Sequence, residues 1–187
     1  MPNSPDTHLP DPDTSTPRPG VAISIDQVQA LVDTIRGWAK ELGFQQIGVT
    51  GIELNEHEAY LQKWLDAGYH GSMDYMARHG SARSRPNELV PGTCTVLSVR
   101  MDYQPLGRAP TDVLASSAHA YISRYALGRD YHKLIRSRLA KLAKRIETEL
   151  GGGQYRAFVD SAPVLERGIA ERASLGWIAK NAMLIND

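Results

Sequence analysis

Apolar side chains recur at helical spacing in three parts of the chain. Residues 24–43 begin with Ser24 and Gln27, which resemble a capping box, and continue with apolar residues three and four positions apart. Residues 55–68 and 130–150 repeat this spacing, and Asp130 is expected to cap the last of these helices. Each of the three segments ends at a glycine or directly before one. Because residues three and four apart share one face of a helix, the pattern predicts three amphipathic helices.

Four shorter apolar segments are typical of β-strands. They cover residues 45–50, 93–103, 119–125 and 155–160, and the second is dense enough in valine and leucine for a central strand. A fourth helix is expected at residues 163–174. This order of elements predicts an α/β fold, or α+β sandwich, in which helices flank a central sheet.

The beginning of the chain has neither periodicity. Residues 1–20 hold six of the eleven prolines and almost no large apolar side chains. Such a segment buries too little surface to offset its ordering entropy. Residues 1–22 are therefore predicted to be a disordered Pro-rich tail, and residues 23–187 to form one domain.

Cations gather in two places. Residues 68–92 contain four glycines together with Arg83 and Arg85, so they are predicted to form either a solvated surface loop or a ligand-binding arm whose arginines meet an anionic group. The long helix carries six cations and no intervening acid, which fits either a solvated helix face or a surface that follows a phosphate backbone: Lys133, Arg136, Arg138, Lys141, Lys144 and Arg145.

Composition restricts the partners and cofactors. The chain of 187 residues carries 21 basic and 21 acidic residues, so no overall charge favours nucleic acid or membrane. No apolar run approaches the roughly 20 residues of a membrane span, and the start lacks an apolar signal core, so a cytoplasmic location is expected. Cys94 is the only cysteine, which excludes an internal disulfide and a cysteine-ligated zinc or iron–sulfur site within these residues. The six histidines lack metal-ligand spacing, so no metal site is predicted.

Asp160 stands at the end of the last predicted strand, just before a predicted helix. Open α/β sheets often place their chemistry at this position, where a dry pocket can turn a carboxyl group into a proton donor. The alternative is that Asp160 or Ser161 caps the following helix, with Pro163 in its first turn. On the pattern alone, the preferences of helix caps favour this second interpretation.

Four motifs together resemble the N-terminal part of epoxyqueuosine reductase, including a region called the domain of unknown function 1730: LVPG, ISRYALGRDYH, FVDSAPVLER and GWIAKN. The resemblance extends over about residues 28–185. It implies a flavin nitroreductase-like central sheet adapted to a corrinoid. It also implies a monomeric enzyme that uses reduced cobalamin to convert epoxyqueuosine to queuosine at the wobble position of tRNA, its partner.

The same resemblance implies roles for particular residues. The family's proton donor is the aspartate of its DSAPVLE motif, which is Asp160 here. The corrinoid contacts lie in the arginine-bearing loop, in ISRYA and around GWIAKN, and they correspond to Arg83, Ser123, Tyr125, Asp160, Lys180, Asn181 and Leu184. The basic helix would then face tRNA phosphates.

Two departures from the family pattern limit these expectations. Ala179 replaces the second glycine of GWIGKN, which requires a negative φ at this position or a shifted loop. The cysteine runs that hold the family's two four-iron clusters lie beyond residue 187. The chain is therefore expected to be C-terminally truncated, to lack a ferredoxin-like iron–sulfur domain and to be catalytically incomplete. Two other functions stay open: a non-catalytic corrinoid-binding or trafficking protein, and a flavin nitroreductase-like enzyme.

Overall fold

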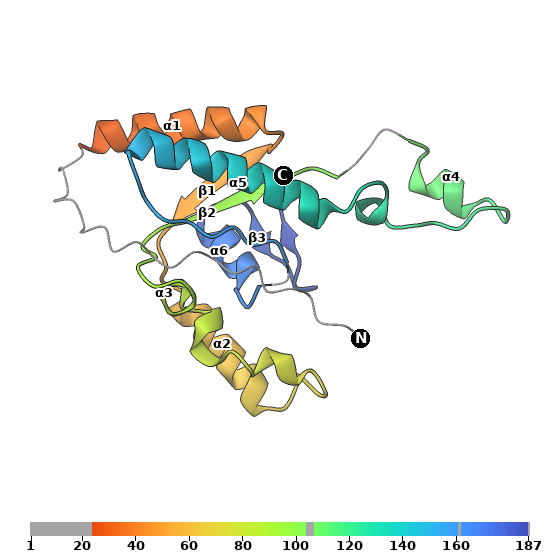
Figure 1. The fold of residues 1–187 in the computed structure, drawn as a ribbon. Coiled ribbons are helices and arrows are strands. Elements are labelled where there is room, and N and C mark those ends of the chain that lie inside the picture. Colours follow the sequence, from red (N-terminus) through yellow and green to blue (C-terminus); the bar gives the residue numbers. More distant parts are fainter. Residues whose placement is uncertain (1–23, 104–106, 161, 187) are drawn as a thin grey trace, which may run out of the picture.

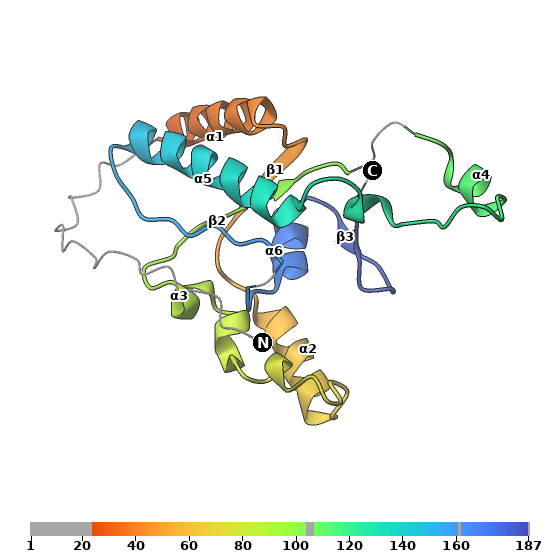
Figure 2. The ribbon, with the colours of Figure 1, turned by 45° about the vertical axis from the view of Figure 1, so that its right-hand side comes forward.

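The computed structural model describes residues 24–103, 107–160 and 162–186. α1 (Ile25–Glu41) and α5 (Tyr131–Leu150) lie side by side over one face of a small sheet, and α6 (Glu166–Arg172) lies against its other face (Figure 1, Figure 2). In this described part of the chain, no helix is both long enough and apolar enough to cross a membrane.

Local signals at its two ends define α1. The Gln27 N–H donates to Ser24 Oγ at 3.2 Å, and the Ser24 N–H donates to Gln27 Oε1 at 2.8 Å, which completes the predicted capping box. After the helix, Gly43 has a φ of 81°, a left-handed conformation that glycine adopts without steric cost. The predicted first helix is confirmed.

The sheet beneath α1 and α5 consists of two antiparallel strands. β1 (Gln46–Thr50) pairs with β2 (Val96–Arg100), with Ile47 opposite Val99. Because successive side chains of a strand point to opposite faces, Ile47 and Gly48 face different layers. Ile47 joins the core under the two helices, whose buried members are Ile35, Ala39, Phe44, Ile47 and Leu142.

The opposite face of this sheet contacts α6 at very short range. A Cβ atom added to Gly48 would lie 2.2 Å from the carbonyl oxygen of Ala173, the residue after α6. Only glycine allows this approach. α6 is thereby held directly under β1.

A second two-stranded sheet follows α6. β3 (Trp177–Ile178) and β4 (Leu184–Ile185) are antiparallel and form a hairpin. Gly176 permits their close approach, since a Cβ there would lie 2.1 Å from the carbonyl oxygen of Ile185. Glu171 Oε1 accepts the Ile178 N–H at 2.8 Å, which ties the hairpin to α6.

One arm of the molecule contains the predicted loop at 68–92 (Figure 1). The arm begins with α2 (Asn55–Asp66), which precedes this loop. The loop itself is partly helical and contains the 3₁₀ turns η1 (Asp74–Met76) and η2 (Gly80–Arg83) and the short helix α3 (Pro86–Leu89). Glu58 joins these elements, because its carboxylate accepts hydrogen bonds from Ser84 Oγ at 2.7 Å and Arg85 Nη2 at 2.8 Å.

A second arm carries α4 (Pro110–Leu114) and η3 (Arg124–Ala126), and here the predicted strand at 119–125 is wrong. Its residues do not join a strand ladder in the described part of the chain, and Tyr121 and Ile122 are 42% and 57% exposed. The alternation of apolar residues is present, but no neighbouring strand among the described residues takes the backbone hydrogen bonds.

The predicted strand at 155–160 is also wrong, because these residues form an irregular segment that crosses the molecule between α5 and α6. Only Val159 is buried in it. The mixed α/β class is confirmed, but the described strands form two separate two-stranded sheets in place of one central sheet. The predicted tail at 1–22 lies outside the described residues.

Gly48→Ala is expected to lower the free energy of unfolding by about 1–3 kcal/mol, because the new Cβ must displace the Ala173 carbonyl. Urea unfolding followed by circular dichroism measures this change. Gly37→Ala within α1 is the matched control: nothing lies within 4 Å of its added Cβ. The control should raise the free energy of unfolding by about 0.5–1 kcal/mol. Equal effects of both substitutions would contradict the close contact.

Candidate active site

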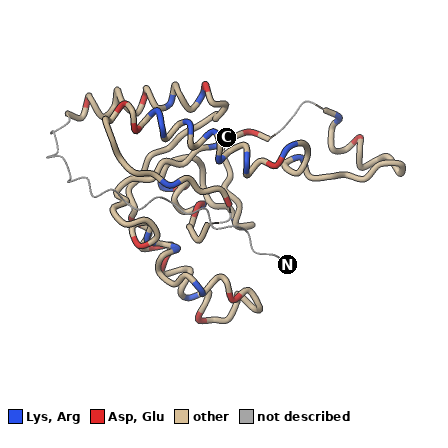
Figure 3. The backbone as a smooth tube through the Cα atoms, viewed as in Figure 1, with Lys and Arg blue, Asp and Glu red and all other residues tan. Residues whose placement is uncertain are grey.

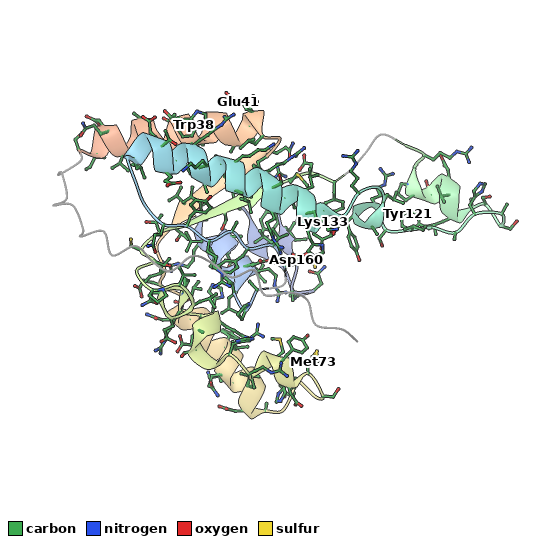
Figure 4. All side chains as sticks on the ribbon, viewed as in Figure 1. Trp38, Glu41, Met73, Tyr121, Lys133 and Asp160 are labelled. Carbon is green, nitrogen blue, oxygen red and sulfur yellow. The ribbon has the colours of Figure 1, made fainter. Side chains whose placement is uncertain are left out.

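Asp160 lies below the N-terminal end of α5, near Lys133 (Figure 4). Its φ of 54° is in the left-handed region, which is uncommon for residues other than glycine but accessible to aspartate. Its side chain is 51% exposed. Unusual backbone conformations are often retained at functional sites, where neighbouring contacts enforce them. The contacts of Asp160 come from two helices.

From α5, two side chains meet the Asp160 carboxylate. The Tyr131 hydroxyl donates a hydrogen bond to Asp160 Oδ2, and His132 Nε2 lies 3.4 Å from the same oxygen. The Tyr131 and His132 rings are stacked, with their centroids 4.1 Å apart. Asp160 is therefore held by two consecutive residues at the start of a long, well-packed helix.

His132 also contacts a second carboxylate. Its Nδ1 lies 3.0 Å from Asp130 Oδ1, which in addition accepts the backbone N–H of His132 and so caps α5 as predicted. Because an ionised carboxylate can only accept, Nδ1 carries a proton and Nε2 faces Asp160. The imidazole thus bridges two carboxylates, and a proton can be shared between Nε2 and Asp160.

These contacts change the acidity of their partners. The hydrogen bond from His132 lowers the pKa of Asp130 below its usual value, which keeps this cap ionised. The hydrogen bond to Asp160 raises the pKa of Tyr131 to about 12, so the phenol stays protonated and continues to donate.

From α6, Glu166 contacts the backbone of Asp160. Glu166 Oε1 accepts the Asp160 N–H at 3.1 Å. Desolvation by the surrounding protein, followed by the nearby charge of Asp160, raises the pKa of Glu166. Two carboxyl groups therefore lie close together, one on the loop and one at the first residue of α6.

The structure does not support Asp160 as a helix cap. α6 starts six residues later, at Glu166, and the residue at its N-cap position, Leu165, makes no side-chain capping bond. The Asp160 carboxylate is directed to Tyr131 and His132 instead. Ser161, the other proposed cap, is outside the described residues.

Tyr125 belongs to the same cluster. Its ring packs edge-on against Tyr131, with centroids 6.2 Å apart and an interplanar angle of 82°. Ser123 precedes the η3 turn that carries Tyr125. Both residues line an open hollow of about 360 Å³, formed by Tyr103, Pro110, Tyr121, Ser123, Arg124 and Tyr125. The structure therefore connects the hollow to Asp160 through aromatic contacts.

Lys180 and Asn181 lie in the turn of the β3–β4 hairpin. The turn is closed by the Ala182 N–H, which donates to the Ala179 carbonyl at 2.8 Å. Arg167, next to Glu166 on α6, donates to the carbonyl oxygen of Ala182. α6 therefore positions this turn as well as the Asp160 loop.

The substitution at Ala179 is compatible with this turn. Three non-glycine residues in the described part of the chain have a positive φ, namely Asp160, Ser174 and Ala182, and Ala179 is not one of them. The backbone at Ala179 is ordinary, so alanine is tolerated where a glycine was expected.

Arg83 and Leu184, which the sequence also predicts as corrinoid contacts, lie in the arm and in the hairpin. Arg83 is 8% exposed, and its guanidinium donates to the carbonyl oxygens of Met76 at 3.0 Å and Tyr75 at 2.7 Å. The Arg83 carbonyl accepts the Leu165 N–H at 3.0 Å, directly before α6. Leu184 pairs with Ile178 in the hairpin. Arg83 thus fixes the arm to the start of α6.

Large apolar side chains remain exposed on η3, just after it, and on the hairpin, the two elements joined to the Asp160 site. They are Tyr125, Leu127, Trp177, Met183 and Ile185. Exposed apolar side chains near polar groups are the residue types that could contact a large, mostly apolar cofactor. A four-iron cluster does not fit, because Cys94 is the only cysteine in the chain.

The sequence identifies Asp160 but not the roles of its neighbours. It predicts Asp130 only as a cap, and it places Tyr131 and His132 only within the ISRYALGRDYH segment. Glu166 has the pattern of an ordinary helix residue. The one signal in the sequence is that these four neighbours of Asp160 lie within two of the motifs. The spacing of the motifs does not show that the beginnings of α5 and α6 meet in the structure.

Comparison with known proteins finds that the chain is similar to a family of reductases. Residues 83–161 match the family described as "Epoxyqueuosine reductase QueG, DUF1730". The epoxyqueuosine reductase of Pseudomonas aeruginosa is 64% identical over 156 residues, which are 83% of this chain and 43% of that protein. The chain spans less than half the length of this relative. It is thus related to the N-terminal part of epoxyqueuosine reductases, as its motifs indicate.

Solved structures of the same name share the fold. An epoxyqueuosine reductase with an epoxyqueuosine-modified tRNA stem loop has a TM-score of 0.69 at 24% identity, covering 84% of this chain and 41% of that chain. The Bacillus subtilis epoxyqueuosine reductase, with its aspartate-bearing catalytic loop swung out of the active site, has a TM-score of 0.58 at 20% identity. It covers 85% of this chain and 42% of that chain.

The phenol of Tyr131 is expected to lose its proton at about pH 12, and Asp160→Asn should lower this midpoint towards the ordinary value near 10. The folded-state pKa is raised, so the stabilisation from this bond is complete below about pH 10 and is lost as the pH rises through about 12. NMR of the tyrosine ring carbons measures the midpoint. Asp112→Asn in α4 is the control, and an unchanged midpoint in Asp160→Asn would contradict the bond.

Proposed function

We propose that this chain is the corrinoid-binding part of a reductase that converts epoxyqueuosine to queuosine at the wobble position of tRNA. The observation that carries the proposal is the Asp160 carboxylate, held by Tyr131 and bridged through His132 to Asp130. This arrangement occurs in a chain whose relatives are epoxyqueuosine reductases.

Reducing an epoxide to an alkene consumes two electrons and two protons and releases the oxygen as water. Cobalamin in its reduced state, when bound, supplies the electrons. Asp160 delivers a proton to the departing oxygen, which is a general-acid step typically worth 10²–10⁴-fold in rate. Its exposed carboxyl group and open hollow leave room for a substrate to approach.

His132, which is 40% exposed, then passes a proton from solvent to Asp160, so that the same carboxyl group can deliver the second proton of the water that is released. Its Nε2 lies 3.4 Å from the carboxylate, and Asp130 holds the opposite nitrogen. Tyr131 keeps the carboxylate oriented, because its raised pKa prevents it from losing its own proton at neutral pH. The three residues thus hold, orient and reload the acid.

The corrinoid contacts that we propose are Ser123, Tyr125, Lys180, Asn181 and Leu184, beside Asp160. Support comes from their position on η3 and the hairpin, where exposed apolar side chains flank the site. Arg83 belongs to the same proposal. Because its guanidinium is bound to backbone carbonyls, it would act by shaping the arm next to α6.

The longer relatives suggest how the site would be completed. We propose that β1 and β2 form part of a nitroreductase-like sheet, and that iron–sulfur clusters are held by residues other than those of this chain. The tRNA stem loop in a structure of the same fold supports tRNA as the partner. A cytoplasmic monomer is part of this proposal.

The loop that carries Asp160 is proposed to move. The Bacillus subtilis enzyme was solved with its aspartate-bearing catalytic loop swung out of the active site. In this chain, the left-handed backbone of Asp160 and the short irregular segment before α6 support a loop with two positions.

A corrinoid-binding or trafficking protein is the second candidate. The exposed apolar surface beside Asp160 favours it, because such a protein needs the corrinoid contacts but no clusters. Titration with cob(II)alamin tests both candidates, and a change in the corrinoid spectrum is expected. A yellow protein with a flavin spectrum and no response to cobalamin would favour a flavin nitroreductase-like enzyme instead.

Asp160→Asn in the full-length protein is expected to retain cobalamin and to lower turnover by roughly 10²–10⁴-fold, because the amide cannot deliver a proton. Asparagine accepts a left-handed backbone, so the loop conformation is kept. Single-turnover formation of queuosine in tRNA measures the effect, with Asp112→Asn as the control. Wild-type turnover in Asp160→Asn would exclude this residue as the acid.

The cations of α5, whose positions along the backbone are marked in Figure 3, are expected to bind tRNA phosphates. Lys144 and Arg145 are paired with Glu147 and Glu41, whereas Lys133, Arg136 and Lys141 are exposed. Replacing these last three by alanine should reduce the slope of log affinity against log salt by about 0.7–0.9 for each phosphate that is no longer neutralised. Lys63→Ala on α2 is the control. An unchanged slope would indicate a solvated helix face.

A further inference from the structure

Contacts at both ends fix the loop between Val159 and α6, and its described residues, 160 and 162–165, belong to no helix or strand. Val159 is buried, and the Leu165 N–H donates to the Arg83 carbonyl at 3.0 Å. α6 itself is anchored by the buried Ile169 and by Gly48 beneath its last turn. A side chain of α6 that contacts this loop would therefore connect a well-anchored helix to the segment that carries Asp160.

Glu166 is such a side chain. It is the first residue of α6, and its Oε1 accepts the backbone N–H of Asp160 at 3.1 Å. The bond is made to the residue of the loop that has a left-handed backbone. It therefore acts on the conformation that directs the Asp160 carboxylate towards Tyr131 and His132.

The negative charge of Glu166 does not explain why this side chain contacts the Asp160 backbone. Desolvation and the proximity of Asp160 both disfavour the charged form of Glu166. An acid in the first turn of a helix is stabilised by the helix dipole, which is the ordinary role for a glutamate at this position. That role needs a negative charge. A hydrogen bond to the Asp160 N–H instead needs an acceptor oxygen on a side chain long enough to reach it.

We propose that Glu166 is a positioning residue that latches the Asp160 loop in place. When the bond forms, the carboxylate of Asp160 stays on Tyr131 and His132. When it breaks, the loop is free to move away from α5. The catalytic consequence of the latch rests on the proposed function, but the latch itself is a property of the 187-residue chain and can be measured without activity.

Two substitutions distinguish the effect of the length of the Glu166 side chain from the effect of its charge. Glu166→Gln keeps an oxygen acceptor at the same distance and removes the charge, while Glu166→Asp keeps the charge and shortens the side chain by one methylene. Glu149→Asp in the last turn of α5 is the matched control. All three changes are conservative and lie in the first or last turn of a helix, so each chain is expected to fold.

The readouts are the hydrogen-exchange rate of the Asp160 amide and the titration of Tyr131, both by NMR. Glu166→Asp should increase the exchange rate by roughly 3- to 10-fold, the range for one net hydrogen bond. It should also lower the Tyr131 midpoint from about 12 towards 10. Glu166→Gln should stay close to wild type in both. The amide of Ile169, in α6, should not change in either variant.

Two outcomes would overturn the latch. One is an Asp160 amide that exchanges at the wild-type rate in Glu166→Asp. The other is an Asp160 amide that exchanges faster in Glu166→Gln, which keeps the acceptor, while Glu166→Asp, which keeps the charge, stays like wild type; this pattern would assign Glu166 to helix electrostatics. If the wild-type full-length protein formed no queuosine while the exchange rates followed the expected pattern, the proposed function would fail and the latch would stand.

Discussion

The close approach of Gly48 to the Ala173 carbonyl fixes most of the candidate site. Because β1 carries no side chain at this position, α6 can lie directly against the sheet. Three attachments then follow from one short helix: Glu166 binds the Asp160 backbone, Arg167 binds the hairpin turn, and Glu171 binds the first hairpin strand. A displacement of α6 would move all of these groups together.

The chemistry of the site follows from how many polar groups surround one carboxylate. Asp160 receives the Tyr131 hydroxyl, faces His132 and lies near the acid Glu166. The hydroxyl donates a hydrogen bond to the carboxylate, the imidazole faces the same oxygen, and Glu166 binds the backbone of the same residue. A carboxylate with an imidazole within reach is typical of groups that exchange protons during a reaction.

The elements with strong local signals were predictable from the sequence. The Ser24 capping box, the Asp130 cap and the glycines after α1 and α5 define those helices by short-range hydrogen bonds and backbone freedom. The predicted strands at 119–125 and 155–160 failed because a strand depends on a partner that can lie far away in the chain. Alternating apolar residues show which side chains seek burial, not whether a neighbouring strand is present.

The candidate site was predictable in part for the same reason. Asp160 was identified through a motif resemblance, since cap preferences alone favoured the wrong role. Arg83 has the residue type of an anion-binding group, yet its guanidinium is bound to two backbone carbonyls, and no sequence pattern distinguishes these uses. The meeting of Tyr131, His132 and Glu166 at Asp160 depends on the packing of α5 and α6, which the sequence does not show directly.

The α2 arm has a consequence for how the molecule responds to its surroundings. No residue of α2 is buried, and the arm is joined internally by the Glu58 carboxylate with Ser84 and Arg85. Exposed ion pairs therefore contribute to holding the arm together, whereas the α1–α5 layer is held by apolar packing. Added salt weakens exposed charge pairs and leaves apolar packing intact, so the two parts lose structure under different conditions. The stability of the arm is therefore expected to depend on ionic strength more than that of the α1–α5 layer does.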